Sequence, residues 1–266
     1  MIKQSGRQKI NFIAQGDGQP VILVHGIAAS ARVWSNLITE LVNAGYRVYA
    51  LDLPGHGDSY KPEEPGHYHV HDIYSALEDW IDSLKLAKPP ALIGHSLGGH
   101  LSLQYSLDHP QDVCRMILID PYYSPKQIFS PARWLQNQAA IGAAAWRRSS
   151  GPLFDQLVIW NPIVSRKLAM NHRQQMAVDL KRASPLILHI LPTVPDLTTK
   201  LGDIRIPTLV IWGSRDLTLR ASTFTKLVSL LPNASAQKIV GTGHQPHLTT
   251  PEIVNSSILD FLATSP

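Results

Sequence analysis

The segment ALIGHSLGGHLSLQYSL, from Ala91 to Leu107, decides the fold class of this protein. It opens with a short apolar run that ends at Gly94, which is typical of a buried strand, and from Gly98 onward it follows a helical pattern. Ser96 lies at the corner between the two, in the pattern G-x-S-x-G. Glycines around such a corner permit a strained turn that lifts the serine hydroxyl clear of the sheet. The motif alone leaves two interpretations of Ser96, a nucleophile or a turn residue.

Short apolar runs alternate with helical patterns on both sides of this segment. The runs KINFIA, VILVHG, YRVYALDL, VCRMILIDP, TLVIWG and AQKIV are typical of strands, and the stretches between them have helical spacing. This alternation predicts an α/β fold, a mostly parallel sheet flanked by helices. It stops between about Tyr122 and Gly202, where several short helices are predicted. We therefore expect a core domain over 1–121 and 201–266, with an inserted helical cap over 122–200.

The predicted cap is rich in large apolar side chains. We expect some of them to form a core within the cap and others to line an apolar pocket over Ser96. Such a cap would exclude water and select the acyl or leaving group. The residues in question are Trp134, Trp146, Phe154, Trp160, Met170 and Met176.

The composition is that of an ordinary globular protein. Of its 266 residues 44% are hydrophobic and 17% charged, which excludes a disordered chain. The net charge is +4 with scattered basic residues, so no nucleic-acid partner is predicted. No apolar window is long enough for a transmembrane segment and no signal peptide is evident, so a cytoplasmic location is expected. The one cysteine, Cys114, excludes an intrachain disulfide and is predicted to be a buried core residue.

The segment HYHVH places His67, His69 and His71 at alternate positions. Alternating histidines on an extended strand are suited to binding a metal, which requires a defined ligand set. No cysteine or carboxylate pattern accompanies them, so we interpret the segment as a solvated loop that leads into the helix containing Ile73. Neither a metal ion nor a cofactor is expected.

A serine nucleophile needs a base, and the base needs a carboxylate that orients it. Asp216 follows the strand pattern TLVIWG and His244 follows AQKIV, so both belong at the same sheet edge as Ser96. Two alternatives stay open. Asp120 also ends a strand and is a second candidate acid. His247 lies three residues after His244 and is the alternative base, although we interpret it as a surface or cap-facing residue.

Five segments together resemble an α/β-hydrolase with a cap domain, namely VILVHGIAAS, LDLPGHGDS, IGHSLGG, IWGSRD and GTGHQPHLTTPE. The resemblance covers nearly the whole chain. It implies Ser96 as the nucleophile, His244 as the base and Asp216 as the acid. It also implies an oxyanion hole formed by the backbone N–H groups of Ile27 and Leu97.

Three histidines and one loop need separate comment. His25 and His56 fall in motifs of the same family and are expected to hydrogen-bond the backbone rather than to catalyse. His95, next to Ser96, has no assigned role. Members of the family often carry a proline a few residues past the acid, whereas this chain has DLTLR, so we expect the loop at Asp216 to differ.

The resemblance implies a serine hydrolase that cleaves a small to medium apolar carboxylic ester, or a related carbonyl compound, through an acyl-enzyme. The serine disfavours epoxide hydrolases and haloalkane dehalogenases of this fold, which use an aspartate nucleophile. One alternative is a C–C bond hydrolase or lyase on the same scaffold. Another is a non-catalytic ligand-binding protein that has kept the fold, against which the complete Ser-His-Asp set argues.

Overall fold

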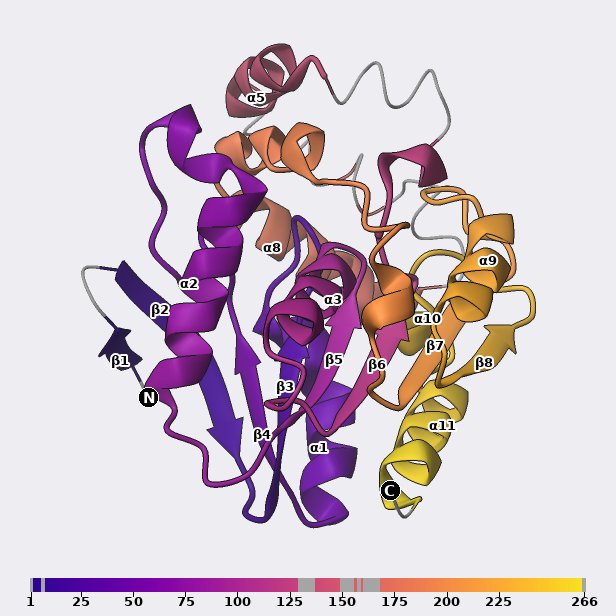
Figure 1. Cartoon of the computed structure of the whole chain (residues 1–266). Coiled ribbons are helices and arrows are strands. Elements are labelled where there is room, and N and C mark those ends of the chain that lie inside the picture. The colour runs from indigo at the N-terminus through magenta and orange to yellow at the C-terminus, as the bar shows by residue number, and fades with distance from the viewer. Residues whose placement is uncertain are drawn as a thin grey trace.

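An eight-stranded sheet runs through the molecule in the order β1-β2-β4-β3-β5-β6-β7-β8 (Figure 1). The structure is a computed structural model that describes residues 2–5, 8–128, 137–148, 156, 159 and 168–264. β1 pairs antiparallel with β2 and β2 with β4, and all other pairs are parallel. The strands are β1 (Ile2–Ser5), β2 (Gln8–Gln15), β3 (Gln19–Val24), β4 (Tyr46–Leu51), β5 (Ala91–His95), β6 (Arg115–Ile119), β7 (Thr208–Gly213) and β8 (Ala234–Ile239).

Helices cover both faces of this sheet. α2, α3 and α9 pack on one face, and α1 and α11 pack on the other (Figure 1). Within the described ranges, no helix combines the length and the apolar character needed to cross a bilayer. These helices are α1 (Ser35–Asn43), α2 (Val70–Ser83), α3 (Leu97–Asp108), α9 (Ser222–Leu230) and α11 (Pro251–Ala263), with the short 3-10 helices η1 (Ala31–Trp34) and η2 (Pro65–Tyr68) before α1 and α2.

Strand residues alternate between two hydrophobic clusters, one on each face of the sheet. In β3, Ile22 and Val24 belong to the cluster under α2 and α3, whereas Val21 and Leu23 belong to the cluster under α1 and α11. Every residue of β5, β6 and β7 is buried. Continuous burial is expected for parallel strands that are covered on both faces, and it explains why these runs are apolar without alternation in the sequence.

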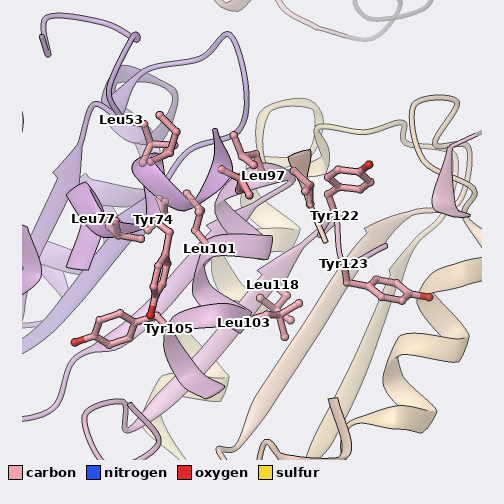
Figure 2. Close-up of a cluster of buried hydrophobic side chains, with 14 of the residues drawn as sticks. Leu53, Tyr74, Leu77, Leu97, Leu101, Leu103, Tyr105, Leu118, Tyr122 and Tyr123 are labelled. Carbon is pink, nitrogen blue, oxygen red and sulfur yellow. The ribbon is translucent and has the colours of Figure 1, made fainter. Parts of the chain in front are cut away.

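Leucines of α2, α3 and β6 meet in the first of these clusters. Figure 2 shows Leu77, Leu101 and Leu118 in this arrangement, with α3 between α2 and the strand. All three side chains are at most 1% exposed. Burying an aliphatic side chain of this size stabilises the fold by about 1.5–3 kcal/mol relative to leaving it in water. The apolar face of α3 therefore fixes the helix whose first residue follows Ser96.

The predicted α/β fold with a mostly parallel sheet is confirmed, whereas β1 and Cys114 differ from the prediction. β1 was not expected, because its residues IKQS show no apolar run. The prediction of a buried Cys114 is wrong, since this residue is exposed. Cys114 comes just before β6, where its N–H donates to the carbonyl of Pro90, and the buried positions on either side of it are Val113 and Arg115.

Between β6 and β7 the described residues form helices and connecting segments, with no strand among them. Trp146 packs against the cluster under α2 and α3, and Met176 against the cluster under α1 and α11. The expected core within the cap stays a prediction, because the cluster that Trp146 packs against includes residues of the insert itself, such as Leu186 and Ile187. Met170 is 44% exposed, and Trp134, Phe154 and Trp160 lie outside the described residues. The boundaries 122–200 of the cap remain a prediction. The helices here are η3 (Pro125–Gln127), α5 (Ala139–Arg148), α8 (Met170–Arg182), η4 (Pro185–His189), η5 (Leu191–Thr193) and η6 (Leu201–Asp203).

Gly98 allows α3 to lie directly against β3. A Cβ atom at this position would collide with the carbonyl oxygen of Val24 and would lie 2.7 Å from that of His25. We predict that Gly98→Ala lowers the free energy of unfolding by about 2 kcal/mol or more, because rigid backbone has to move. Urea denaturation measures this change. Gly66→Ala is the control, since nothing lies within 4 Å of its Cβ position, and equal stabilities of the two variants would contradict the prediction.

Candidate active site

Ser96 lies at the turn between β5 and α3, where the sequence predicted it. Its backbone has φ 51 and ψ −113, in a region that is strained for any residue other than glycine. Its N–H donates to the carbonyl of Ile119 at 3.0 Å, and its carbonyl accepts the N–H groups of His100 at 3.2 Å and Tyr122 at 3.0 Å. These bonds to a strand, a helix and a loop keep the strained conformation in place.

The glycines around Ser96 leave room for this turn. A Cβ atom at Gly94 would collide with the carbonyl oxygen of Gly98 and would lie 2.6 Å from Oγ of Ser102. At Gly26, in the loop after β3, a Cβ atom would lie 3.1 Å from Cβ of Ser96. The loop after β3 therefore packs directly against the serine.

His244 lies in the loop after β8 and connects Ser96 to Asp216. Its Nε2 is 3.0 Å from Oγ of Ser96, and its Nδ1 is 2.7 Å from Oδ2 of Asp216. Because a carboxylate only accepts, Nδ1 carries the proton, and the neutral ring leaves Nε2 free to accept from the serine hydroxyl. The structure thus brings together three residues that the sequence places in three separate loops.

Asp216 is held as a carboxylate by its surroundings. Its Oδ1 accepts the N–H groups of Thr218 at 2.7 Å and Leu219 at 3.0 Å. Burial by itself raises the pKa of Asp216, but His244 and these N–H groups outweigh burial, so the pKa lies below its ordinary value. Because its carboxylate accepts the backbone N–H two residues later, Asp216 itself stabilises the turn. This explains how DLTLR forms the turn without a proline.

The loops that carry Asp216 and His244 are in direct contact. A Cβ atom at Gly213 would collide with the carbonyl oxygen of Gly243 and would lie 2.6 Å from that of Thr242. The N–H of Arg215 donates to the same Thr242 carbonyl at 2.8 Å. The glycine of the GSRD segment therefore lets the two loops approach closely enough for the imidazole to reach the carboxylate.

Asp120, the alternative acid, lies next to Asp216 and His244. It is fully buried, and its Oδ1 accepts the N–H of Gly213 at 3.0 Å. Oxygen atoms of both aspartates and a ring nitrogen of His244 lie within 4.8 Å of one another. The hydrogen bond to the ring is made by Asp216 and not by Asp120.

Leu97 and Ile27 are the two residues predicted to supply the oxyanion N–H groups. Leu97 is the first residue of α3, so its N–H has no acceptor within the helix. Ile27 is half-buried and follows Gly26, which packs against the serine. Ala28, next in the chain, has a φ of 59, which indicates a tightly turned loop. Leu97 thus follows Ser96 directly, and Ile27 follows the glycine that packs against the serine, while their role in binding an oxyanion stays a prediction.

The sequence profile described as the Alpha/beta hydrolase family matches residues 21–256 of the chain. The chain belongs to the alpha/beta hydrolase family. This hydrolase is 28% identical over 276 aligned positions to a 2-hydroxy-6-oxononadienedioate/2-hydroxy-6-oxononatrienedioate hydrolase of Escherichia coli, and the alignment covers 97% of this chain and 91% of the relative.

Two solved structures share the fold of this hydrolase. One is the enol-lactonase from Burkholderia xenovorans, with a TM-score of 0.84, 18% identity, and coverage of 99% of this chain and 100% of that one. The other is a thermophilic esterase from Thermogutta terrifontis, with a TM-score of 0.80, 23% identity, and coverage of 96% and 93%. At these identities the likeness concerns the fold alone.

His25 and His56 of the hydrolase bond the backbone, as predicted. Nδ1 of His25 donates to the carbonyl of Gly26 at 2.7 Å, and its Nε2 accepts the N–H of Leu53 at 3.0 Å. Nδ1 of His56 donates to the carbonyl of Pro54 at 2.9 Å. Burial lowers the pKa of His25 and lowers that of His56 to about 3. Both rings are therefore neutral, and their hydrogen bonds stabilise the loops around the site.

His95 holds the backbone of His244, a function that the sequence did not reveal. Its Nε2 donates to the carbonyl of His244 at 2.8 Å, and its ring lies 4.9 Å from that of His244 and 4.6 Å from that of His247. Burial keeps the pKa of His95 well below its usual range, so the ring is neutral. In the sequence, the one feature that could have suggested this role is a histidine at the end of an apolar strand, directly before Ser96.

Of the two places predicted for His247, the surface is wrong, because the side chain is buried, whereas the cap-facing position agrees with the electrostatic effect on it of His172 in α8 of the insert. The residue lies in α10 (Pro246–Thr249), is 5% exposed, and its ring is 5.0 Å from that of Trp34. Burial lowers its pKa to about 3. The sequence does not indicate whether a histidine three residues after His244 is buried, because its burial depends on the packing of η1, which contains Trp34.

Among the described residues, the side chains of types able to bind a metal that converge are Asp120, Asp216 and His244. All three belong to the site already described. His67, His69 and His71 are exposed and fall in η2 and at the start of α2. His69 caps α2 by accepting the N–H of His71 at 3.2 Å.

Helix α8 of the insert reaches the loop after β3 through Asp179. Its Oδ1 accepts the hydroxyl of Ser30 at 2.9 Å and the amide of Gln175 at 2.8 Å. Asp179 is fully buried, and burial raises its pKa. A lone aspartate on a polar helix gave no sequence signal for this contact with the segment that carries Ile27.

We predict that Asp179→Asn is more stable than the wild type at pH 8, because burial raises the pKa of Asp179. The amide oxygen keeps both hydrogen bonds, while the variant no longer buries a negative charge. Because the folded-state pKa is raised, the wild type loses stability as pH rises through it, so the gain should disappear near pH 4 and below, about the ordinary value for aspartate. Thermal unfolding at both pH values measures this, with the exposed Asp17→Asn as control. A less stable Asp179→Asn at pH 8 would contradict the prediction.

Proposed function

We propose that this hydrolase cleaves small to medium apolar carboxylic esters through an acyl-enzyme on Ser96. The series of hydrogen bonds from Ser96 to His244 at 3.0 Å and from His244 to Asp216 at 2.7 Å supports this most directly. A hydroxyl bonded to a neutral imidazole, itself oriented by a buried carboxylate, is an activated nucleophile. The preference for an apolar substrate is inferred from the apolar sequence of the segment between β6 and β7.

In the proposed reaction, Nε2 of His244 takes the proton of Ser96 as Oγ attacks the ester carbonyl carbon. The N–H groups of Ile27 and Leu97 bind the oxyanion that forms. As the tetrahedral intermediate collapses, His244 gives its proton to the alkoxide, which leaves as the alcohol. Water then attacks the acyl group, its proton passing to His244 and on to Ser96 as the acid departs. Asp216 holds the ring tautomer and stabilises the charged imidazolium.

Replacement of Ser96 tests this assignment. We predict that Ser96→Ala lowers kcat/KM for p-nitrophenyl butyrate at least about 10⁴-fold, the order expected when a nucleophile is removed, and abolishes labelling by a fluorophosphonate probe. Ser102→Ala is the control, because its hydroxyl lies on the same helix and donates to the carbonyl of Gly98 at 2.8 Å; it should label as the wild type does. Wild-type labelling of Ser96→Ala would refute the nucleophile.

A second candidate function is hydrolysis of a C–C bond in a vinylogous diketone. It is favoured by the Escherichia coli relative, whose name specifies a 2-hydroxy-6-oxo compound. Such a substrate presents a ketone where an ester has its carbonyl, so hydrolysis at that carbon releases a carbon leaving group. The same serine and histidine would serve both reactions.

A substrate panel separates the two candidates. For p-nitrophenyl butyrate we predict a kcat/KM at least about tenfold above that for a 2-hydroxy-6-oxo-dienoate, since a site selects by differential stabilisation of one transition state. Both substrates are assayed with the wild type and with Ser96→Ala as the blank. The opposite order would favour the C–C hydrolase.

A further inference from the structure

Two buried carboxyl groups meet at the carboxyl edge of the sheet. β6 and β7 are parallel neighbours with Ile119 opposite Ile211, and the N–H of Asp120 donates to the carbonyl of Ile211 at 2.9 Å. Asp120 is fully buried, and Asp216 is 5% exposed. Their oxygen atoms lie within 4.8 Å of each other. At this spacing in a dry site, like charges repel strongly and one carboxyl keeps its proton.

The hydrogen-bond donors decide which of the two is ionised. Asp216 accepts three hydrogen bonds, from the ring of His244 and from two backbone N–H groups. From the part of the chain that the structure describes, Asp120 accepts one, from the N–H of Gly213 to Oδ1. Donors stabilise the charged form, so the negative charge belongs on Asp216 and the proton on Asp120.

Oδ2 of Asp120 has one acceptor at hand. This atom is buried, and among the described residues Asp216 is the one group within reach to pair with it. We propose that Asp120 is a neutral carboxylic acid whose Oδ2–H donates to the carboxylate of Asp216. In agreement with this geometry, burial and the charge of Asp216 raise the pKa of Asp120 well above its usual range. The backbone φ of 40 at Asp120 is one that aspartate and asparagine tolerate better than most residues.

Among the described residues, imidazoles are the titratable groups that contacts place near this pair. His244 faces Asp216, and His95 of β5 and His247 of α10 lie beyond it. His100 of α3 contacts the backbone of Tyr122, and burial lowers its pKa to about 4. Because burial also keeps His95 and His247 neutral, these rings do not offset a second negative charge on Asp120.

A hydrogen-bond donor to Asp216 on the side away from His244 has two consequences for the proposed reaction. This part of the inference rests on the proposed function. The donor fixes the rotation of the carboxylate so that one oxygen stays on Nδ1 of His244. It also withdraws charge from that carboxylate, so the ring binds its proton less tightly than it would beside an unshared carboxylate. Asp120 is thus a positioning residue that acts through Asp216.

Two substitutions test the role of the proton. Asp120→Asn keeps an oxygen for the N–H of Gly213 and gives an amide N–H to Asp216, so kcat should stay within about threefold and the acid limb of kcat/KM against pH should not move. Asp120→Ala removes the donor. It should lower kcat about tenfold with KM unchanged and shift the acid limb to higher pH by about half a unit or more.

The opposite shift would overturn the proposal. If Asp120 carried a negative charge, Asp120→Asn would remove that charge from beside His244, and the acid limb would move to lower pH. This result with the isosteric variant decides the question even where Asp120→Ala fails to fold.

Infrared difference spectroscopy tests the proton without any substrate. At neutral pH the wild type should show the C=O stretch of a buried carboxylic acid that is missing in Asp120→Asn and retained in Ser96→Ala. An unchanged band in Asp120→Asn would overturn the protonation of Asp120. If the band is found but esters are not cleaved, the proposed function fails while the shared proton stands.

Discussion

The backbone of Ser96, held at φ 51 between a strand and a helix, is the constraint on which the rest of the site depends. A strained residue persists only where its surroundings determine it several times over. Here the N–H and carbonyl of the serine are bonded to β6, to α3 and to the segment after β6. The close approach of Gly94 and Gly98 makes that packing sterically possible, and the apolar face of α3 anchors it to the core.

Rigid loops at the carboxyl edge of the sheet then supply the remaining groups. The loops after β7 and β8 touch through Gly213, and His95 fixes the carbonyl of His244. The electrostatics follow from burial. Several histidines crowd this edge, and burial keeps His95 and His247 neutral. The carboxylate of Asp216 therefore interacts with the ring of His244, to which it is hydrogen-bonded, and not with a charged His95 or His247.

The insert is tied to the same edge through polar contacts. Asp179 of α8 accepts the hydroxyl of Ser30, and Arg182 at the end of that helix pairs with Asp58 at 2.8 Å. The N–H of Ser184 donates to the carbonyl of Gly55 at 2.8 Å. These contacts fall on the loops after β3 and β4, so the position of α8 and the shape of the loop that carries Ile27 depend on each other.

The sequence by itself determined the parallel sheet, its flanking helices and the order of Ser96, Asp216 and His244, because apolar runs and glycine-flanked corners are local patterns. It left open whether Asp216 or Asp120 meets the imidazole, it predicted a buried Cys114 that is exposed, it did not predict that His247 is buried, and it had no role for His95. Those outcomes depend on contacts between segments far apart in the chain, such as the 2.8 Å bond from His95 to the carbonyl of His244. Only the tertiary structure decided them, because burial, protonation and hydrogen bonding at this edge depend on which loops the sheet brings together.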